Sequence, residues 1–324
     1  MCSTIVACAL LLCQPGEMSV KLTYSGYSLN RNTIPRFLDS WTDPTLDVVV
    51  VPVWGSLNFV NSLASAAVTL GGRLGKTVIN KARFIIVLEQ IGKKLVVAAP
   101  IETETDATYL MEQNTSAKFL DLRGMVGNLP EKDSYILAYA RSMVFWHTQN
   151  QYCGACGNKT QQKKGGHVRY CSSNDCSIEH FPRIDPAVIM LITNESCSES
   201  VCLLGRQEKW PAGSYSCLAG FVEPGETVEE TVAREVKEEV GIPIFNISYL
   251  ASQPWPFPSS LMLGFRAQTQ TMSLKIDSEE LEDARWFTRK EVMAFGPWGH
   301  DSDGFKKPRP DSIAHWLITD WLNG

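Results

Sequence analysis

The sequence predicts a mixed α/β protein, and its hydrophobic pattern supports this in three ways. Short apolar runs typical of buried strands occur at residues 46–53, 82–88 and 94–99. Over residues 133–148, apolar side chains instead recur every three or four positions, as on one face of an amphipathic helix. A further apolar run at residues 187–193 then begins a second strand-containing region.

The composition is that of an ordinary globular protein. The chain has 324 residues, of which 44% are hydrophobic and 20% charged. These values exclude disordered, collagen-like and fibrous proteins. The formal net charge of -5 means that the chain as a whole offers no basic field for binding a phosphate polymer. An anionic substrate must therefore be bound locally, through metal ions.

The N-terminal region contains an apolar run at residues 5–13 that is too short to span a membrane. We interpret this run as a buried strand, with a targeting segment as the alternative. Translation from Met18 would remove it. The Gly92-Lys93 step separates two strand-like runs and indicates a hairpin. The first 130 residues contain no cluster of reactive side chains, so we expect a β-rich supporting domain over residues 1–146.

Four cysteines follow the predicted helix and form two closely spaced pairs. Cys153 and Cys156 have two residues between them, and Cys171 and Cys176 have four. Both pairs lie on turn-forming sequence, so their thiolates can converge on one Zn²⁺ ion per chain. The alternatives are two disulfides or free thiols. A closed four-thiolate site leaves no position for a substrate, so we expect a structural zinc ribbon over residues 147–182.

A run of carboxylates lies on a predicted helix in the remaining region, residues 183–324. Glu235 and Glu239 are one helical turn apart, with Glu238 beside them, and Gly241 ends the helix. Three oxygen ligands on one helix face suit Mg²⁺ or Mn²⁺. The alternative is an acidic helix face that is merely solvated, with basic neighbours offsetting its charge.

Residues 220–242 resemble a Nudix box, GX5EX7REUXEEXGU, with every fixed position present. This resemblance implies an α/β/α sandwich that hydrolyses nucleoside diphosphates linked to another group, using a divalent metal. It implies metal ligands at Glu235, Glu239 and the Ala219 carbonyl, with Glu238 as a ligand or water-orienting group. The box positions with a structural role would be Gly220, Glu226, Arg234 and Gly241.

A proline-rich segment, SQPWPFPS, covers residues 252–259. Its three prolines restrict the backbone and remove hydrogen-bond donors, so it cannot be a central strand. We expect a stiff loop that holds Trp255 and Phe257 in place; a proline-rich surface turn or a polyproline ligand is the alternative. The apolar run at 261–267 predicts a strand, which places the loop at the edge of the same sheet.

Together with the box and the four-cysteine ribbon, this segment resembles the NADH pyrophosphatase subfamily from about residue 135 onward. The resemblance implies hydrolysis of NADH to reduced nicotinamide mononucleotide and AMP, removal of NAD caps from RNA, and a homodimer. It implies that Phe221 stacks on a base, while Phe181 replaces the family's usual tyrosine and so lacks its hydroxyl group. The implied substrate contacts are Phe181, Phe221, Ser252, Gln253, Pro254, Trp255, Pro256, Phe257, Pro258, Ser259 and Ala314.

The resemblance also implies one more acidic metal ligand downstream. Alignment on Trp286 favours Glu280, with Glu279 and Glu282 as alternatives. The metal would bridge the pyrophosphate and position the attacking water. The group that accepts the proton of that water is Glu238 or Glu280.

Two other functions are compatible with the sequence. One is a Nudix hydrolase of another dinucleotide or a nucleotide sugar, and the other is a binding module without catalysis. The complete set of glutamates counts against the second. We expect an intracellular protein, in the cytoplasm, peroxisome or mitochondrion, that binds a small dinucleotide and NAD-capped RNA 5′ ends but no membrane.

Overall fold

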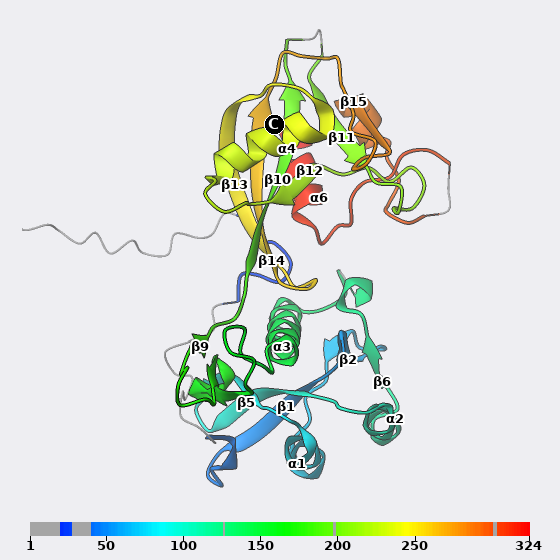
Figure 1. Cartoon of the computed structure of the whole chain (residues 1–324). Coiled ribbons are helices and arrows are strands. Elements are labelled where there is room, and N and C mark those ends of the chain that lie inside the picture. Colours follow the sequence, from blue (N-terminus) through cyan, green and yellow to red (C-terminus); the bar gives the residue numbers. More distant parts are fainter. Residues whose placement is uncertain (1–19, 28–39, 126, 197–198, 301–302) are drawn as a thin grey trace, which may run out of the picture.

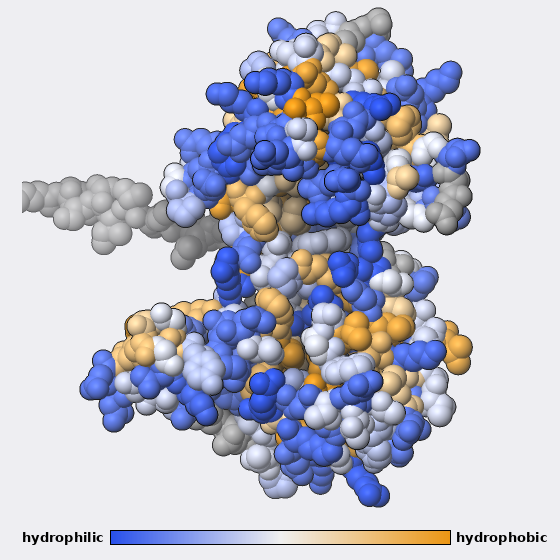
Figure 2. Space-filling model, turned by 45° about the vertical axis from the view of Figure 1, so that its right-hand side comes forward, coloured by the Kyte–Doolittle hydropathy of each residue, from blue (hydrophilic) through white to orange (hydrophobic). Residues whose placement is uncertain are grey.

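The structure is a computed structural model that describes residues 20–27, 40–125, 127–196, 199–300 and 303–324. The apolar run at 5–13 lies outside these residues. Figure 1 shows two sheet-containing halves, one above the other, and Figure 2 shows a waist between them. None of the described helices is long and apolar enough to cross a membrane.

The N-terminal half contains a six-stranded mixed sheet in the order β3-β2-β1-β5-β4, with β6 paired to β2. Its strands are β1 (Asp47–Trp54), β2 (Leu57–Asn61), β3 (Ala66–Ala67), β4 (Ile86–Ile91), β5 (Lys94–Pro100) and β6 (Ala117–Leu120). The hairpin predicted at Gly92-Lys93 is confirmed, because β4 and β5 pair there in antiparallel fashion. The strand predicted to start at residue 82 starts only at Ile86.

Helices cover both faces of this sheet (Figure 1). They are α1 (Gly72–Lys81), α2 (Glu104–Gln113) and α3 (Glu131–Gln149), with short 3-10 helices at Ser40–Thr42 and Leu122–Met125. Side chains alternate along β5, so that Leu95 and Val97 face α1 and α2, whereas Val96 and Ala98 face α3. The amphipathic helix predicted over 133–148 is confirmed as α3.

A small three-stranded ribbon follows α3 and contacts the N-terminal sheet. Its elements are β7 (Thr160–Lys163), a 3-10 helix (Lys164–Gly166), β8 (Val168–Cys171) and β9 (Glu179–His180). The ring Nε2 of His167 lies 2.8 Å from the Val87 carbonyl oxygen of β4. The Ile85 amide also donates a hydrogen bond to the Gln162 side chain of β7, at 3.2 Å. The ribbon is therefore attached to the N-terminal half.

The C-terminal half is an α/β/α sandwich around a sheet in the order β13-β14-β10-β11-β15, with β12 paired to β10. The strands are β10 (Asp185–Asn194), β11 (Val201–Arg206), β12 (Leu218–Phe221), β13 (Phe245–Trp255), β14 (Ser260–Gln268) and β15 (Asp283–Thr288). Helix α4 (Val228–Val240) covers one face, while α5 (Arg289–Met293) and α6 (Ile313–Asn323) cover the other (Figure 1). The predicted mixed α/β architecture is thus confirmed.

The proline-rich segment differs from the predicted stiff loop. Its first half continues β13, where Pro254 lies opposite Leu261 and Trp255 opposite Ser260. Only the residues between Trp255 and Ser260 form a turn, so the segment is the end of a β-hairpin. The prolines are tolerated because β13 is an edge strand, where one side of the backbone needs no partner.

Candidate active site

Helix α4 presents the carboxylates, and local sequence fixes where it begins and ends. At its N-terminus, the Thr227 side chain accepts a hydrogen bond from the Glu230 amide, and the Glu230 carboxylate accepts one from the Thr227 amide. Gly241 ends the helix in the left-handed conformation, with φ of 71°. Apolar residues from Val232 to Val240 pack on the sheet. This orientation buries Glu235 and Glu239 and leaves Glu238 exposed.

Three carboxylates from two segments converge beside the sheet. Glu235, Glu239 and Glu280 each place an oxygen within 4.8 Å of the others. Glu280 lies in the loop between β14 and β15, which is tied to α4 by a hydrogen bond from the Asp277 amide to the Glu239 carbonyl, at 2.9 Å. Of the other two candidates for the downstream ligand, Glu282 pairs with Arg206, and the metal-ligand group among the described residues does not include Glu279.

Glu239 has the electrostatically least favourable position in this cluster. Burial, together with the charges of Glu235, Glu280 and Glu238, raises its pKa from 4.5 to about 8. Burial also raises the pKa of Glu235, against the opposing charge of Arg234. Oxygen Oε2 of Glu239 is buried and has no hydrogen-bond partner among the described residues. A divalent cation would satisfy this oxygen and offset the like charges, so the residues fit a metal.

Arg234 connects the loop before α4 to the carboxylates. Its guanidinium contacts Glu226 at 2.6 Å, Glu235 at 2.8 Å and Glu238 at 3.0 Å. It also donates a hydrogen bond to the Phe221 carbonyl at 3.0 Å. Arg234 lowers the pKa of Glu226 to about 2, so this carboxylate stays charged. These contacts support the structural role that the resemblance implies for Glu226 and Arg234.

Gly220 is required by the close approach of Glu235. A Cβ atom at position 220 would lie 1.8 Å from the carboxyl carbon of Glu235, which no side chain can do without moving the carboxylate. The glycine therefore leaves room for a ligand carboxylate beside the strand. This is the physical reason for a glycine at this position of the box.

A cavity of about 620 Å³ opens beside the carboxylates. Ala219, Glu239 and Glu280 line it, together with the turn at residues 207–209. Nothing in the sequence marks this turn, because it carries no motif and precedes the box. Phe221 is 60% exposed at the end of β12. The cavity therefore gives a polyanionic substrate access to the carboxylates.

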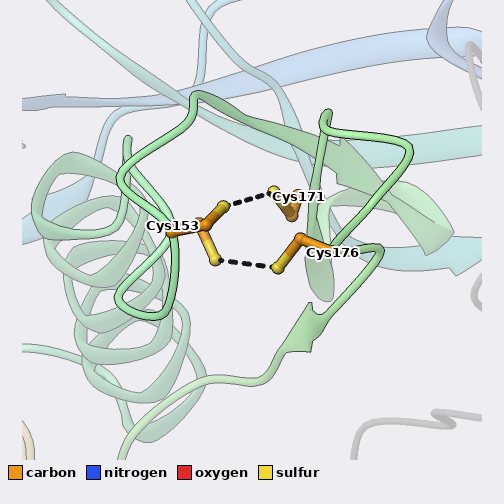
Figure 3. A group of neighbouring side chains, drawn as sticks. Cys153, Cys171 and Cys176 are labelled. Atoms are coloured by element: carbon orange, nitrogen blue, oxygen red, sulfur yellow. Dashed lines mark hydrogen bonds between the residues drawn. The ribbon is translucent and has the colours of Figure 1, made fainter.

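The four cysteines converge at the other candidate metal site (Figure 3). Their sulfurs all lie within 4.8 Å of one another. The Cys153–Cys176 and Cys156–Cys171 sulfur pairs are 3.8 and 3.3 Å apart, too far for the roughly 2 Å of a disulfide. All four thiols are free. Four converging thiols fit a tetrahedral Zn²⁺ site without an open position.

Several side chains of the predicted substrate array form hydrogen bonds within the protein itself. The Gln253 amide is fully buried and donates to the carbonyls of Thr23 and Asp311, at 3.1 and 2.6 Å. Its oxygen accepts a hydrogen bond from the Ile313 amide at 2.7 Å. The Ser259 hydroxyl donates to the Asp185 carboxylate of β10 at 2.8 Å. In this arrangement these two side chains stabilise the fold through contacts within the protein.

The aromatic residues of the array face the N-terminal half. Trp255 and Phe257 contact Tyr24, with ring centroids 6.1 and 5.7 Å apart. Ser252, Pro254 and Pro258 are the exposed members. Trp255 and other array residues line a second cavity, of about 270 Å³, which shares no lining residue with the carboxylate cavity.

The remaining two predicted substrate contacts differ in their exposure to solvent. Ala314, near the start of α6, is 3% exposed, and its carbonyl accepts a weak hydrogen bond from the Cys217 thiol at 3.9 Å. The contact of its backbone with a substrate stays a prediction. Phe181 is 62% exposed just before β10.

Two family descriptions match this chain. Residues 183–307 match the NUDIX domain, and residues 149–181 match the NADH pyrophosphatase zinc ribbon domain. The chain therefore contains a NUDIX domain preceded by an NADH pyrophosphatase zinc ribbon, which confirms the resemblance drawn from its motifs.

Several curated relatives align with more than half of this chain. The human NAD-capped RNA hydrolase NUDT12 is 44% identical over 200 residues, covering 60% of this chain and 43% of the relative. The NAD-capped RNA hydrolase NudC of Stutzerimonas stutzeri is 41% identical, covering 58% of this chain and 61% of the relative. The human mitochondrial NAD(P)H pyrophosphatase NUDT13 is 37% identical, with coverage of 65% and 61%. The alignments thus span about half of the relatives' lengths.

Proposed function

We propose that this chain hydrolyses the pyrophosphate bond of NADH and NAD⁺, producing AMP and the corresponding nicotinamide mononucleotide. The observation that carries the proposal is the convergence of Glu235, Glu239 and Glu280, with one buried oxygen of Glu239 left without a partner. The names of the relatives, NAD-capped RNA hydrolase and NAD(P)H pyrophosphatase, support the substrate.

The three carboxylates would hold Mg²⁺ or Mn²⁺, with the Ala219 carbonyl at the wall of the same cavity. When bound, such a metal offsets phosphate charge and lowers the pKa of a coordinated water. Arg234 holds Glu235 and Glu238 in fixed positions through its guanidinium. Glu280, which lines the cavity, or the exposed Glu238 on the neighbouring turn of α4 would accept the proton of the attacking water.

NAD-capped RNA is a second substrate in this proposal, because two of the relatives are named for that activity. The cap presents the same pyrophosphate to the carboxylates. The chain's net charge of -5 disfavours tight binding of the RNA body, so recognition would be centred on the cap. We propose an intracellular location, which the mitochondrial name of one relative supports.

We also propose that the chain forms a homodimer. Within one chain, the second cavity, beside Trp255, and the cavity beside the carboxylates are lined by different residues. In addition, Phe181, Phe221 and Tyr249 are each more than half exposed, and a second copy would shield such rings from water. Light scattering coupled to gel filtration tests this: a dimer mass supports the proposal, and a monomer mass at micromolar concentration contradicts it.

The direct test of the activity is product analysis by mass spectrometry. Purified protein is incubated with Mg²⁺ or Mn²⁺ and with one substrate at a time: NADH, NAD⁺, ADP-ribose or NAD-capped RNA. The Glu239→Gln variant serves as the inactive control. Reduced nicotinamide mononucleotide and AMP from NADH, formed by wild type alone, are the expected products. Cleavage of ADP-ribose alone would indicate a different Nudix hydrolase. No cleavage by folded, zinc-loaded protein would favour a binding module.

A further inference from the structure

The tip of the β13–β14 hairpin, residues 255–259, is held by one buried arginine of the N-terminal half. Arg141 of α3 is 7% exposed. Its Nε donates a hydrogen bond to the Pro256 carbonyl at 2.8 Å. The guanidinium also lies over the Phe257 ring, 4.7 Å from the ring centroid. A single side chain thus contacts both the backbone and the aromatic ring of the tip.

The same guanidinium reaches a second, separate segment. It donates a hydrogen bond to the Ser56 carbonyl, in the turn between β1 and β2. Arg141 therefore links α3, the β1–β2 turn and the hairpin tip. Burying a cation is costly unless its donors find partners, and an apolar side chain could fill this space at lower cost. The arginine provides instead a rigid, planar set of donors that fixes direction as well as distance.

The position of the tip also sets the shape of the second cavity. Pro254, Trp255 and Pro256 form one part of its wall, and α3 contributes Tyr135 and Trp146. A displacement of the tip relative to α3 would therefore open or distort this cavity. The N-terminal half, in which the sequence indicated no reactive side chains, thus controls the geometry of the array.

We infer that Arg141 is a positioning residue that fixes the hairpin tip, and that the N-terminal half thereby sets substrate affinity. The inference rests on the proposed function for its effect on the substrate, but not for its effect on the tip. Loss of Arg141 should weaken binding of the ground state and the transition state alike, because the carboxylates on α4 are untouched.

The test compares Arg141→Met and Arg141→Lys with Arg83→Met. Arg83 is a matched control in the same half, where it forms an exposed ion pair with Glu102. For NADH hydrolysis, we expect Arg141→Met to raise KM about tenfold with kcat within about twofold of wild type. Arg141→Lys, which keeps the positive charge but lacks the planar set of guanidinium donors, should give an intermediate KM. Arg83→Met should match wild type.

Hydrogen exchange measured by mass spectrometry gives a readout that does not require activity. Amides of residues 252–261 should exchange faster in Arg141→Met than in wild type or Arg83→Met, with β10 unchanged. Unchanged exchange at the tip, or a fall in kcat at constant KM, would overturn the inference. If wild type does not hydrolyse NADH, the proposed function fails and exchange alone decides whether Arg141 holds the tip. If Arg141→Met does not fold, the same two measurements on Arg141→Lys decide.

Discussion

The two metal-ligand clusters of this chain are built in opposite ways. The four thiols of the ribbon come from one segment of 24 residues, between Cys153 and Cys176. The three carboxylates come from α4 and from a loop that lies beyond two further strands. The first cluster is closed by its own ligands, whereas the second borders a cavity of about 620 Å³. The closed thiol cluster suits a site that stabilises the fold, whereas the carboxylate cluster suits a site that a substrate can enter.

The electrostatics of the two clusters show the same contrast. A neutral thiol does not repel its neighbours, but charged carboxylates do: burial and the charges of Glu235, Glu280 and Glu238 together raise the pKa of Glu239 to about 8. The fold therefore carries an unfavourable arrangement at the carboxylates in the absence of metal. Arg234 offsets only part of it, since its guanidinium contacts Glu235 and Glu238 but no contact with Glu239 is found in the described part of the chain. Carboxylates with pKa values perturbed in this way are commonly found at functional sites.

The largest effect expected on activity is that of Glu239→Gln. Replacing the buried carboxylate removes a proposed metal ligand but keeps the size of the side chain. We expect kcat to fall about 10³-fold, equivalent to about 4 kcal/mol in activation free energy. Circular dichroism and zinc content should be unchanged. A variant with nearly normal turnover would show that Glu239 is not a ligand.

The corresponding test of the thiol cluster is Cys171→Ser in the ribbon. Structural zinc sites contribute binding free energies of about 10–16 kcal/mol in isolated zinc-finger peptides, so this variant should lose zinc and melt at a much lower temperature. Metal analysis should give one zinc per chain for wild type. The neighbouring Ser172→Ala is the control, since its hydroxyl donates a hydrogen bond to the Lys159 carbonyl and, among the described residues, has no contact with the cysteine sulfurs. Unaltered zinc content in Cys171→Ser would contradict the four-thiolate site.

Glu280→Gln distinguishes the third carboxylate from its acidic neighbours. Glu280 belongs to the carboxylate cluster, while Glu282 pairs with Arg206 at the surface. We expect kcat to fall about 10- to 100-fold in Glu280→Gln, or about 1.4–2.7 kcal/mol. Glu282→Gln should stay within about twofold of wild type. Steady-state kinetics at saturating Mn²⁺ provides the measurement, and equal losses in both variants would remove Glu280 from the ligand set.

The smallest predicted effect concerns the stability of the metal-free protein. Folded Glu239 keeps its proton up to about pH 8, whereas an unfolded glutamate loses it near 4.5. Between these values the folded state binds more protons than the unfolded state, so this contribution to stability falls as pH rises. Metal-free Glu239→Gln should thus melt above wild type at pH 8, by about 2–4 °C for each kcal/mol recovered.

Differential scanning fluorimetry in EDTA-free buffer, after removal of weakly bound divalent ions, measures this difference from pH 5 to 8. Retained zinc is verified by metal analysis, so that the ribbon stays intact in both proteins. Added Mg²⁺ should raise the melting temperature of wild type more than that of Glu239→Gln. Parallel pH profiles for the two proteins would contradict the raised pKa of Glu239.

Features encoded by local spacing could be predicted from the sequence. The cysteine pairs lie on short turns, and α4 carries its own cap and its own valine stripe, so neither depends on distant residues. Glu280 was predicted only through a resemblance, because nothing in its local sequence distinguishes it from Glu279. Arg141 leaves only a weak signal in the sequence, a charged residue within the apolar pattern of α3.

The sequence by itself thus determined the four-cysteine cluster, the carboxylate helix and the mixed α/β class, because these follow from periodicity and spacing along a short stretch of chain. Only the tertiary structure decided that Gln253 and Ala314 face the protein interior, that Phe257 lies against Arg141, and that two cavities are separate. These features arise from contacts between residues far apart in the chain. Local propensity cannot specify such contacts, since they depend on how whole elements pack.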